Sequence, residues 1–392
     1  MEEKDCSSYY SREEIFKVGT IEEWYKAFIE SRALERQELI AAGVIDNPAV
    51  QKPLEEAKPF RGTCIYMCPS FESVQRIHQK MVDKFEMTDG KPDHKKFVKS
   101  FHRPAAGLEA PLPCDVRKPW ILVGTLHYLV KEILGRYPWQ ECQGFVRDRT
   151  RSIRQDFTYQ NYEGDEAVHC TEVIIRFHLV GLYLLPDNDE YMELEQLGKS
   201  LTTLSFLYKA SQVPDADGNY KRFPNEAEFR SYMILTHIHD GYVEREDFMK
   251  WPEEVRNSEQ VKHAIRIYQA AQKCLRGSAE GFNAMHYANT FFTLVASEKT
   301  DFTTACLLEV YFADIRKSAL QAIASNYMKT SKMTTLDFIQ DLLYYEEIED
   351  LIDEIENYGL EVGQNTIDGV SYTYLVLGGK KFNSKFEACF LV

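Results

Sequence analysis

Apolar residues recur at three- and four-residue steps along most of the chain, with charged and polar residues between them. This spacing is typical of amphipathic helices, because side chains three or four positions apart share one helix face. Short stretches rich in Pro, Gly, Asn and Asp separate the periodic segments and mark loops. We predict a mainly α fold, an irregular helical solenoid without a fixed sequence repeat. The expected helices span residues 21–42, 70–85, 119–134, 143–161, 165–185, 188–212, 226–239, 258–275, 281–296 and 301–329.

The pattern changes near the C-terminus, where two short amphipathic segments, 334–343 and 346–358, precede two β-rich segments, 371–377 and 385–392. A Gly-Gly pair between the β-rich segments supplies a turn, so the two strands are expected to form a hairpin. Two helices followed by a β-hairpin are typical of a winged helix. We therefore expect three parts: an N-terminal helical extension over 1–58, a helical solenoid over 59–329 and a winged helix over 330–392.

One predicted helix, QGFVRDRTRSIRQDFTYQN over 143–161, combines an apolar stripe with a high density of charge. It holds four arginines and two aspartates: Arg147, Asp148, Arg149, Arg151, Arg154 and Asp156. By the 3.6-residue period Arg149 lies at the edge of the apolar stripe, where a guanidinium needs carboxylate or carbonyl partners. Two interpretations stay open, namely arginines that clamp neighbouring helices through bidentate bonds and a phosphate-binding face. The interspersed aspartates weaken any positive field and favour clamping.

The predicted winged helix carries its negative and positive charges in separate places. Its second helix holds seven carboxylates over 346–356 and no Lys or Arg, so it would repel phosphate, which argues against DNA reading in the major groove. Basic residues surround this helix: Lys380 and Lys381 in the hairpin turn, Lys385 after it, and Arg316, Lys317, Lys329 and Lys332 on the preceding long helix and near its end. These seven residues are candidate contacts for single-stranded RNA. The alternative is a polar turn with solubilising lysines.

Composition limits the possible functions. The 392 residues, 44% of them hydrophobic, are enough for a globular chain of two or three domains. A net charge of −15 is the wrong sign for coating nucleic acid alone, so RNA contact needs a local basic patch or a surface shared with partners. The N-terminus lacks the apolar core of a signal peptide, and no run of 18 apolar residues predicts a membrane span. Nine cysteines without framework spacing indicate reduced thiols of the nucleus or cytosol.

Motifs for catalysis are missing from the sequence. It contains no nucleophile elbow, Walker A loop, HExxH or GxGxxG. Cys64 and Cys68 stand four apart and His78 follows, but a structural zinc site needs a second pair of ligands that the sequence does not supply. We expect neither an enzyme nor a bound cofactor or metal.

Four segments together resemble the signature of one protein family. They are FRGTCIYMCPSFESVQR at 60–76, FHRPAAGLEAPLPCDVRKPWILVGTLHYLV at 101–130, FVRDRTRSIRQD at 145–156 and FRSYMIL at 229–235. In this order they resemble the GANP (Sac-three/GANP) family, the helical scaffolds of the TREX-two mRNA-export complex. The resemblance extends from about residue 54 to the C-terminus. It implies a helical solenoid of the TPR/PCI-like kind that ends in a winged helix.

The resemblance implies a non-enzymatic scaffold. In PCI-type proteins the terminal winged helix pairs with that of a second PCI protein, and here a small acidic protein of the Sem/Dss type would brace the pair. The assembly would bind single-stranded mRNA without sequence specificity on the nucleoplasmic side of the nuclear pore, at the nuclear envelope. Contacts to the export receptor and the pore are expected from regions outside this chain.

Two alternatives stay open. A paralogous PCI scaffold would act in transcription elongation or splicing. A bracing subunit of a proteasome lid, signalosome or initiation-factor assembly would share the solenoid and the winged helix and make no RNA contact. Subunits of these assemblies would not be expected to carry the four segments.

Overall fold

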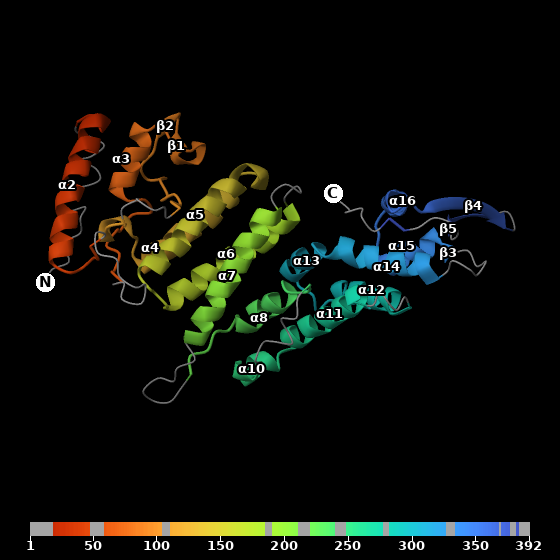
Figure 1. The fold of residues 1–392 in the computed structure, drawn as a ribbon. Coiled ribbons are helices and arrows are strands. Elements are labelled where there is room, and N and C mark those ends of the chain that lie inside the picture. The colour runs from red at the N-terminus through yellow and green to blue at the C-terminus, as the bar shows by residue number, and fades with distance from the viewer. Residues whose placement is uncertain are drawn as a thin grey trace. The chain divides into compact units, whose positions relative to one another are not determined.

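The computed structural model describes residues 19–47, 59–103, 110–184, 190–210, 220–239, 248–276, 282–326, 334–367, 370–376 and 382–383. The chain divides into two compact units (Figure 1): unit 1 comprises 1–174 and 203–213, and unit 2 comprises 175–202 and 214–392. The described residues are mostly helical, and a small antiparallel sheet lies near the C-terminus. The predicted mainly α fold is therefore confirmed, while the division into parts at residues 58 and 329 stays a prediction.

Unit 1 begins with helix α2 (Ile21–Ala41), which ends one residue before the predicted position. A capping box starts it: the Thr20 hydroxyl accepts a hydrogen bond from the Glu23 amide at 3.3 Å, and the Glu23 carboxylate accepts one from the Thr20 amide at 2.8 Å. The Arg32 guanidinium holds the Asp115 carboxylate through two bonds of 2.6 Å. This bidentate pair ties α2 to the rest of unit 1.

The next predicted helix is shorter than expected. Helix α3 (Ser70–His78) packs along α2 and ends well before residue 85. A 3₁₀ turn (Lys84–Glu86) then leads into a hairpin of β1 (Met87–Thr88) and β2 (Lys91–Pro92), whose turn residues Asp89 and Gly90 both have positive φ. The hydrophobic pattern predicts no strand in this region, so the hairpin corrects that prediction. Its sequence signal is the Asp-Gly pair.

The arginine helix is α5 (Trp139–Tyr159), and it starts four residues earlier than predicted. Helix α4 (Pro119–Tyr128) and a π-helical turn (Leu129–Leu134) precede it and fill the range predicted for one helix. The apolar stripe of α5 is buried as predicted, at Cys142, Val146, Ile153 and Phe157. Burial of this stripe places the charged residues of α5 at the border of the core.

Helices α6 (Asp165–Leu184) and α7 (Glu190–Ala210) each contribute to both units. Within the described ranges α6 is the one helix long and apolar enough to cross a membrane, with a mean hydropathy of 1.3 in its most apolar window. However, 67% of that window is buried inside the protein. Helix α6 also carries the buried His178, whose Nδ1 lies 2.5 Å from the buried Glu193 carboxylate of α7. These are features of the core helix of a globular protein.

Unit 2 continues as a succession of helices: α8 (Glu226–Leu235), α10 (Glu253–Arg256), α11 (Glu259–Arg276), α12 (Phe282–Val295), α13 (Phe302–Glu309) and α14 (Phe312–Asn326). The single helix predicted over 301–329 is wrong, because the chain turns at Val310 and Tyr311. Neither Pro nor Gly marks this turn in the sequence. The buried Tyr311 holds it, since its hydroxyl donates to the Thr236 carbonyl at 3.1 Å.

A C-terminal module follows, in the order β3 (Thr334–Thr335), α15 (Leu336–Leu343), α16 (Ile348–Asn357), β4 (Glu361–Ile367) and β5 (Val370–Val376). The strands pair antiparallel in the order β3-β5-β4. Leu375 of β5 pairs with Thr334 and Val362 and is buried. The described module thus contains two helices and a β-hairpin in one small sheet, and its assignment as a winged helix stays a prediction.

The hairpin uses different residues from those predicted. Strand β4 over 361–367 pairs with β5 over 370–376, whereas the prediction pairs 371–377 with 385–392. The predicted last strand lies outside the described residues. The sequence indicates β4 only as a brief alternation at 360–362, so its pairing with β5 was not predicted.

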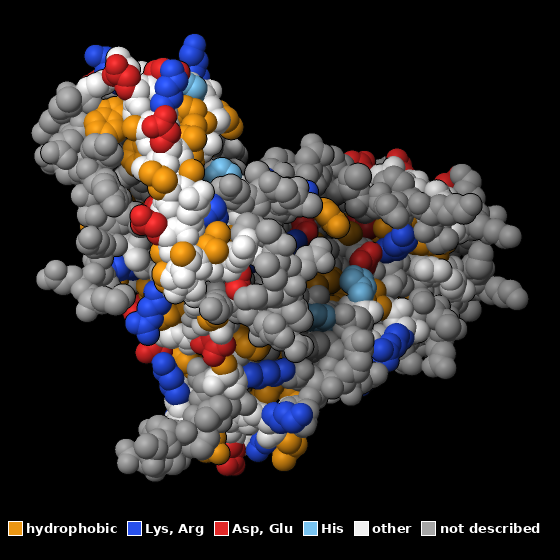
Figure 2. Space-filling model, turned by 60° about the vertical axis from the view of Figure 1, so that its left-hand side comes forward, with side chains coloured by type: hydrophobic (Ala, Val, Ile, Leu, Met, Phe, Trp, Pro, Cys, Tyr) orange, Lys and Arg blue, Asp and Glu red, His pale blue; other side chains and the backbone are white. Residues whose placement is uncertain are grey.

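The surface mixes charges of both signs. On the face drawn in Figure 2, Lys and Arg side chains are interspersed with Asp and Glu and with apolar side chains. A broad field of one sign is not visible among the described side chains of that face.

Candidate functional site

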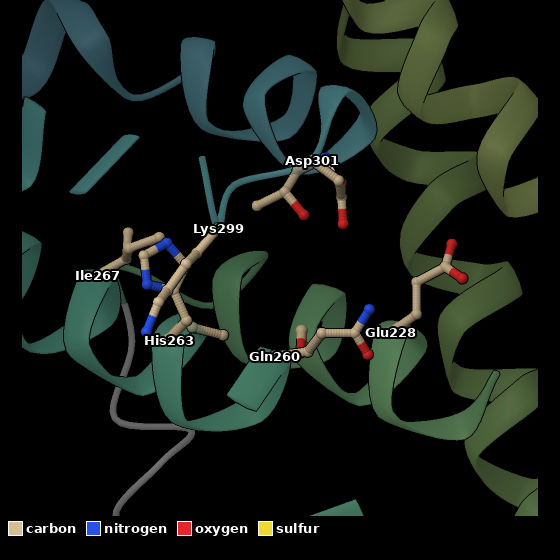
Figure 3. A pocket seen from close by; sticks show the side chains of 9 residues that line it. Glu228, Gln260, His263, Ile267, Lys299 and Asp301 are labelled. Carbon is tan, nitrogen blue, oxygen red and sulfur yellow. Dashed lines mark hydrogen bonds between the residues drawn. The ribbon is translucent and has the colours of Figure 1, made fainter. Parts of the chain in front are cut away.

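Unit 2 contains a small depression lined by residues of α8, α11 and the turn before α13 (Figure 3). Its polar lining includes Glu228, Gln260, His263, Lys299 and Asp301, and it has room for about one water molecule. Burial lowers the pKa of His263, whose Nε2 lies 2.8 Å from the Thr300 hydroxyl. A depression of this size does not enclose an organic substrate. Within the described ranges no three His, Cys, Asp or Glu side chains come together as a metal site.

Burial makes several of the described cysteine thiols weak acids. Burial raises the pKa of Cys64, Cys170 and Cys274 to about 12 each. Thiols with such pKa values stay protonated near neutral pH and pack as small apolar groups. None of the seven described cysteines forms a disulfide.

The most elaborate polar arrangement of unit 1 centres on Asp156 of α5. Its carboxylate is fully buried and accepts hydrogen bonds from Lys99 Nζ at 2.5 Å, from Arg117 Nε at 2.7 Å and from the Arg117 amide at 3.2 Å. Both cations are themselves buried. A buried carboxylate is stable when it is paired and hydrogen-bonded in this way. Asp156 therefore joins α5 to two segments that lie 57 and 39 residues earlier in the chain.

Arg117 and Lys99 extend this arrangement to the first resemblance segment. The Arg117 guanidinium also donates to the Met67 carbonyl at 3.3 Å and to the Ser152 hydroxyl of α5 at 2.8 Å. The Lys99 amide donates to the same Met67 carbonyl at 3.0 Å. One carbonyl of the segment at 60–76 is thus held by both cationic residues.

Gly62 lets two backbones approach closely beside this arrangement. A Cβ at Gly62 would lie closer than 3.0 Å to the Val116 carbonyl oxygen, so glycine is needed there. The Gly62 amide donates to Gln160 Oε1 at 2.9 Å, and Gln160 Nε2 donates to the Arg117 carbonyl at 3.0 Å. Gln160 follows the last residue of α5, so the C-terminal end of this helix anchors both segments.

A second buried carboxylate, Glu86, lies beside Arg149. Glu86 Oε1 accepts from Arg76 Nη1 at 3.0 Å and from the Val98 amide at 3.0 Å, and Arg149 Nη2 lies 3.5 Å from the same oxygen. Arg149 is 6% exposed, contacts the Asp148 carboxylate and stacks on a neighbouring ring. Arg149 therefore has the carboxylate partners that its place on the apolar stripe requires.

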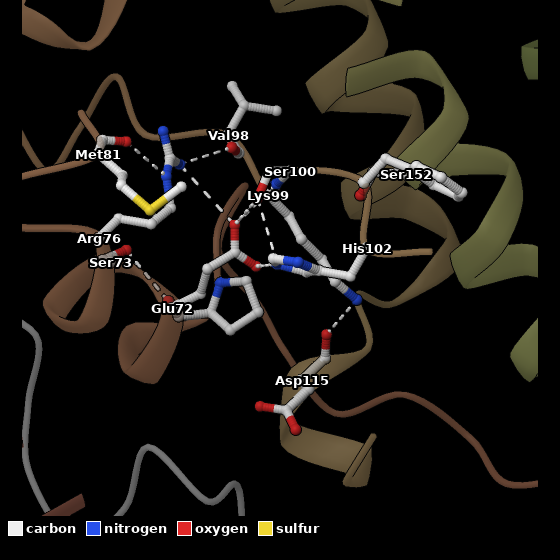
Figure 4. A network of polar contacts seen from close by, with 12 residues as sticks. Glu72, Ser73, Arg76, Met81, Val98, Lys99, Ser100, His102, Asp115 and Ser152 are labelled. Atoms are coloured by element: carbon white, nitrogen blue, oxygen red, sulfur yellow. Dashed lines mark hydrogen bonds and ion pairs between the residues drawn. The ribbon is translucent and has the colours of Figure 1, made fainter. Parts of the chain in front are cut away.

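Glu72 of α3 holds the segment that follows Lys99 (Figure 4). Its Oε1 accepts from the Ser100 amide at 2.7 Å and the Ser100 hydroxyl at 2.9 Å, and its Oε2 lies 3.7 Å from His102 Nε2. Burial alone raises the pKa of Glu72, but the interaction with His102 and the hydrogen bond from the Ser100 amide outweigh burial and hold the pKa at about 2. The interaction with the Glu72 carboxylate in turn raises the pKa of His102, against the opposing effect of desolvation.

The other arginines of α5 are half-buried. The Arg151 guanidinium lies 4.0 Å from the centroid of the Phe101 ring. Burial, with the neighbouring charge of Arg151, lowers the pKa of Arg154 to about 10. Arg147 and Arg154 both interact with neighbouring groups. The contacts of Arg149, Arg151 and Asp156 favour internal clamping over a phosphate-binding face.

The structure describes two of the seven candidate RNA contacts. Arg316 Nε and Nη2 donate to the carbonyls of Leu343 at 3.2 Å and Tyr344 at 2.7 Å, and the guanidinium lies 4.0 Å from the centroid of the Tyr345 ring. Arg316 thus fastens α14 to the end of α15. Lys317 is half-buried and interacts with neighbouring groups. The other five, Lys329, Lys332, Lys380, Lys381 and Lys385, lie outside the described residues.

Helices α15 and α16 and the connection between them expose a set of carboxylates: Asp337, Asp341, Glu346, Glu347, Glu349, Asp350, Asp353 and Glu356. The sequence between residues 333 and 379 contains no Lys or Arg. Such a surface repels phosphate. Most of the carboxylates predicted for the second helix are therefore exposed on the surface of the C-terminal module.

Comparison with known proteins identifies the family. A model of the SAC3/GANP family matches residues 67–364, a range that contains α5, its buried partners and the helices of the C-terminal module. The chain belongs to the SAC3/GANP family. The resemblance carried by the four sequence segments is confirmed.

Three relatives of the SAC3/GANP chain cover most of its length. SAC3 family protein 1 of Schizosaccharomyces pombe is 36% identical over 376 residues, which are 92% of this chain and 36% of that protein. Protein xmas of Drosophila melanogaster is 30% identical over 323 residues, 78% of this chain and 15% of that protein. SAC3 family protein B of Arabidopsis thaliana is 27% identical over 332 residues, 77% of this chain and 18% of that protein. The chain thus spans about a third of the first relative and less than a fifth of the other two.

Sequence reasoning singles out Asp156 and Arg149 but misses their partners. Lys99 stands in a lysine-rich stretch that is typical of a solvated surface, and Arg117 stands in a proline-rich segment. A signal was present at both, because Phe97-Val98 and Val116 place apolar residues directly before the two cations. Cations that directly follow apolar residues are candidates for buried ion pairs.

Proposed function

We propose that this chain is a non-enzymatic scaffold subunit of a nuclear mRNA-export complex. Membership of the SAC3/GANP family, over a match that contains most of the chain, is the observation that supports this proposal. The buried ion pairs of unit 1 support it too, because they join distant segments into a fixed surface and place no reactive group in a cavity. The role places the protein in the nucleus, on the nucleoplasmic side of the pore.

The C-terminal module is proposed to pair with the winged helix of a second PCI protein, and a small acidic protein of the Sem/Dss type braces the pair. The exposed carboxylates of α15 and α16 favour a protein partner for this module, since phosphate would be repelled there. Contacts to the export receptor and to the pore are assigned to regions outside this chain.

The proposed complex holds single-stranded mRNA on a composite basic surface. The residues proposed for this surface from the C-terminal part are Lys380, Lys381 and Lys385, with Lys317, Lys329 and Lys332. We leave Arg316 out of this surface because its guanidinium is engaged by two carbonyls and a ring inside unit 2.

Affinity purification of the chain from native extract, followed by mass spectrometry, tests the scaffold role. Recovery of a second PCI protein together with a small acidic subunit is expected. Recovery of splicing or elongation factors would assign the chain to a paralogous complex. Recovery of proteasome-lid or signalosome subunits would overturn the export proposal.

Charge reversal tests the RNA surface of the purified complex. Changing Lys380, Lys381 and Lys385 to glutamate is expected to weaken binding of single-stranded RNA and to reduce its salt dependence by about 0.7 per lost phosphate contact. The matched control reverses three exposed lysines of unit 1: Lys80, Lys91 and Lys95. Equal affinities of the two variants would refute a specific role for the C-terminal lysines.

A further inference from the structure

Helix α11 of unit 2 carries a line of polar side chains on its exposed face, and most of them are cations. The line consists of four cations, Lys262, Arg266, Lys273 and Arg276, and one uncharged member, Gln269; all five are exposed, and we name it the α11 stripe. Its members follow one another at steps of four, three, four and three residues, so they fall within a sector of about 80°. The stripe extends over roughly 21 Å at 1.5 Å per residue. The opposite face of α11 is buried in unit 2, which fixes the direction of the stripe.

Helix α11 has one carboxylate of its own, at its first residue. Glu259 opens α11, and it lies 3.4 Å from Lys299, 3.6 Å from Arg266 and 4.0 Å from Lys262. Three cations therefore surround this one carboxylate. From residue 260 to the end of α11 the sequence contains no Asp or Glu, so within the helix itself the four cations of the stripe outnumber the carboxylates.

Helix α12 packs against α11 and presents uncharged polar and aromatic groups beside the stripe. Residues 282–295 contain no Asp, Glu, Lys or Arg. His286 and Thr293 are exposed, Tyr287 is half-buried, and Lys273 Nζ lies 5.0 Å from the centroid of the Tyr287 ring. A row of cations beside an aromatic and hydrogen-bonding strip suits a polymer that has a charged backbone and planar bases.

We propose that the α11 stripe binds the phosphate backbone of single-stranded RNA, while the exposed groups of α12 contact bases or sugar hydroxyls. This inference rests on the proposed RNA-binding function and adds a second RNA site, on the helical body, to the C-terminal lysines. The alignment of four cations along one helix face suits a ligand that carries a row of negative charges. An acidic polypeptide shares the charge, but it offers no planar bases for the ring of Tyr287 and the imidazole of His286.

Fluorescence anisotropy with a short labelled oligo(U) and the full chain tests the proposal. Each phosphate contact with a single strand contributes about 0.7 to the slope of log affinity against log salt. Reversing Lys262, Arg266 and Lys273 to glutamate is therefore expected to lower that slope by about 2 and to weaken binding roughly a hundredfold at about 0.1 M salt. Replacing the same three residues with glutamine gives a milder change of the same sign, and circular dichroism confirms that both variants fold.

Two further variants separate this inference from the proposed function. Glutamate at Lys380, Lys381 and Lys385 tests the C-terminal lysines, and glutamate at Lys80, Lys91 and Lys95 is the control of equal charge. An α11 variant with unchanged affinity, beside a C-terminal variant that loses affinity, overturns the α11 site and leaves the proposed function standing. An unmodified chain that does not bind oligo(U), alone or in its purified complex, overturns both. Poly-glutamate that displaces oligo(U) from the unmodified chain but not from the α11 variant would instead assign the stripe to an acidic protein and overturn the RNA site.

Discussion

Asp156→Ala is the substitution that tests the structural account of α5 most directly. It removes the carboxylate that pairs with Lys99 and Arg117, both of which are buried, and leaves two cations without their partner. Removing one member of a buried ion pair costs about 3–5 kcal/mol of stability. Because this carboxylate accepts three hydrogen bonds from two cationic residues, we expect a loss near the upper end, about 4–5 kcal/mol. That is a large part of the total stability of about 5–15 kcal/mol of a typical domain.

Hydrogen exchange read by mass spectrometry measures the loss in unit 1 separately from unit 2. A loss of about 4–5 kcal/mol corresponds to exchange of α5 amides that is faster by roughly three powers of ten, since each 1.4 kcal/mol is tenfold. Asp156→Asn keeps the shape of the side chain and one acceptor oxygen. Its α5 amides should therefore exchange at a rate between those of the unmodified chain and of Asp156→Ala. Glu141→Ala, which breaks the exposed pair with Lys84 at 2.8 Å, is the matched control and should leave the exchange unchanged. Exchange in Asp156→Ala that rises less than tenfold would refute the reasoning.

Further predictions follow from the contacts of the same two units. Gly62→Ala should lower the urea midpoint of unit 1, at a cost of about 1–3 kcal/mol, because the added Cβ meets the Val116 carbonyl oxygen; an unchanged midpoint would show that the two segments separate easily. In NMR titration His102 should have a pKa above its ordinary 6.5, and Glu72→Gln should bring it down. Since the pKa of His102 is raised, the contact between His102 and Glu72 stabilises the fold fully below pH 6.5, and this contribution of His102 is lost as pH rises through its raised pKa. The pKa of Glu72 is lowered, so the contribution of Glu72 is present above pH 4.5 and is lost as pH falls through about 2. Arg316→Ala should cost about 2 kcal/mol of stability, because it removes the donor to two carbonyls at the end of α15. Faster hydrogen exchange of α15 amides is the readout. Arg316→Lys should restore slow exchange only in part, because an ammonium does not reproduce the planar guanidinium fork.

The helices of this protein follow from local information, and their predicted positions agree with the structure where that information suffices. Helices α2, α5 and α11 lie within four residues of their predicted ends because apolar periodicity is a property of neighbouring residues. The break between α13 and α14 was not predictable in this way. It depends on Tyr311, whose hydroxyl bonds a carbonyl 75 residues away and leaves no Pro or Gly signal in the sequence.

For the charged residues too, local sequence predicts some features, while others depend on segments distant in the chain. The position of Arg149 on the apolar stripe predicts that it needs carboxylate partners, but the identity of Glu86 depends on how three segments meet. The α11 stripe was within reach of sequence reasoning, because Lys262, Arg266 and Lys273 recur at helical spacing. In the sequence the stripe is obscured by the net charge of −15 and by the carboxylates that precede the helix.

The buried ion pairs of α5 also determine the order in which unit 1 can be completed during synthesis. Lys99 and Arg117 leave the ribosome 57 and 39 residues before Asp156, the carboxylate that neutralises both. Until Asp156 emerges, the two segments cannot bury their cations without a large desolvation cost, so these side chains stay hydrated. Translation past residue 156 is thus the step that allows these segments to close. In a nascent chain stalled before that point, the segments that carry Lys99 and Arg117 would stay accessible to proteases and chaperones.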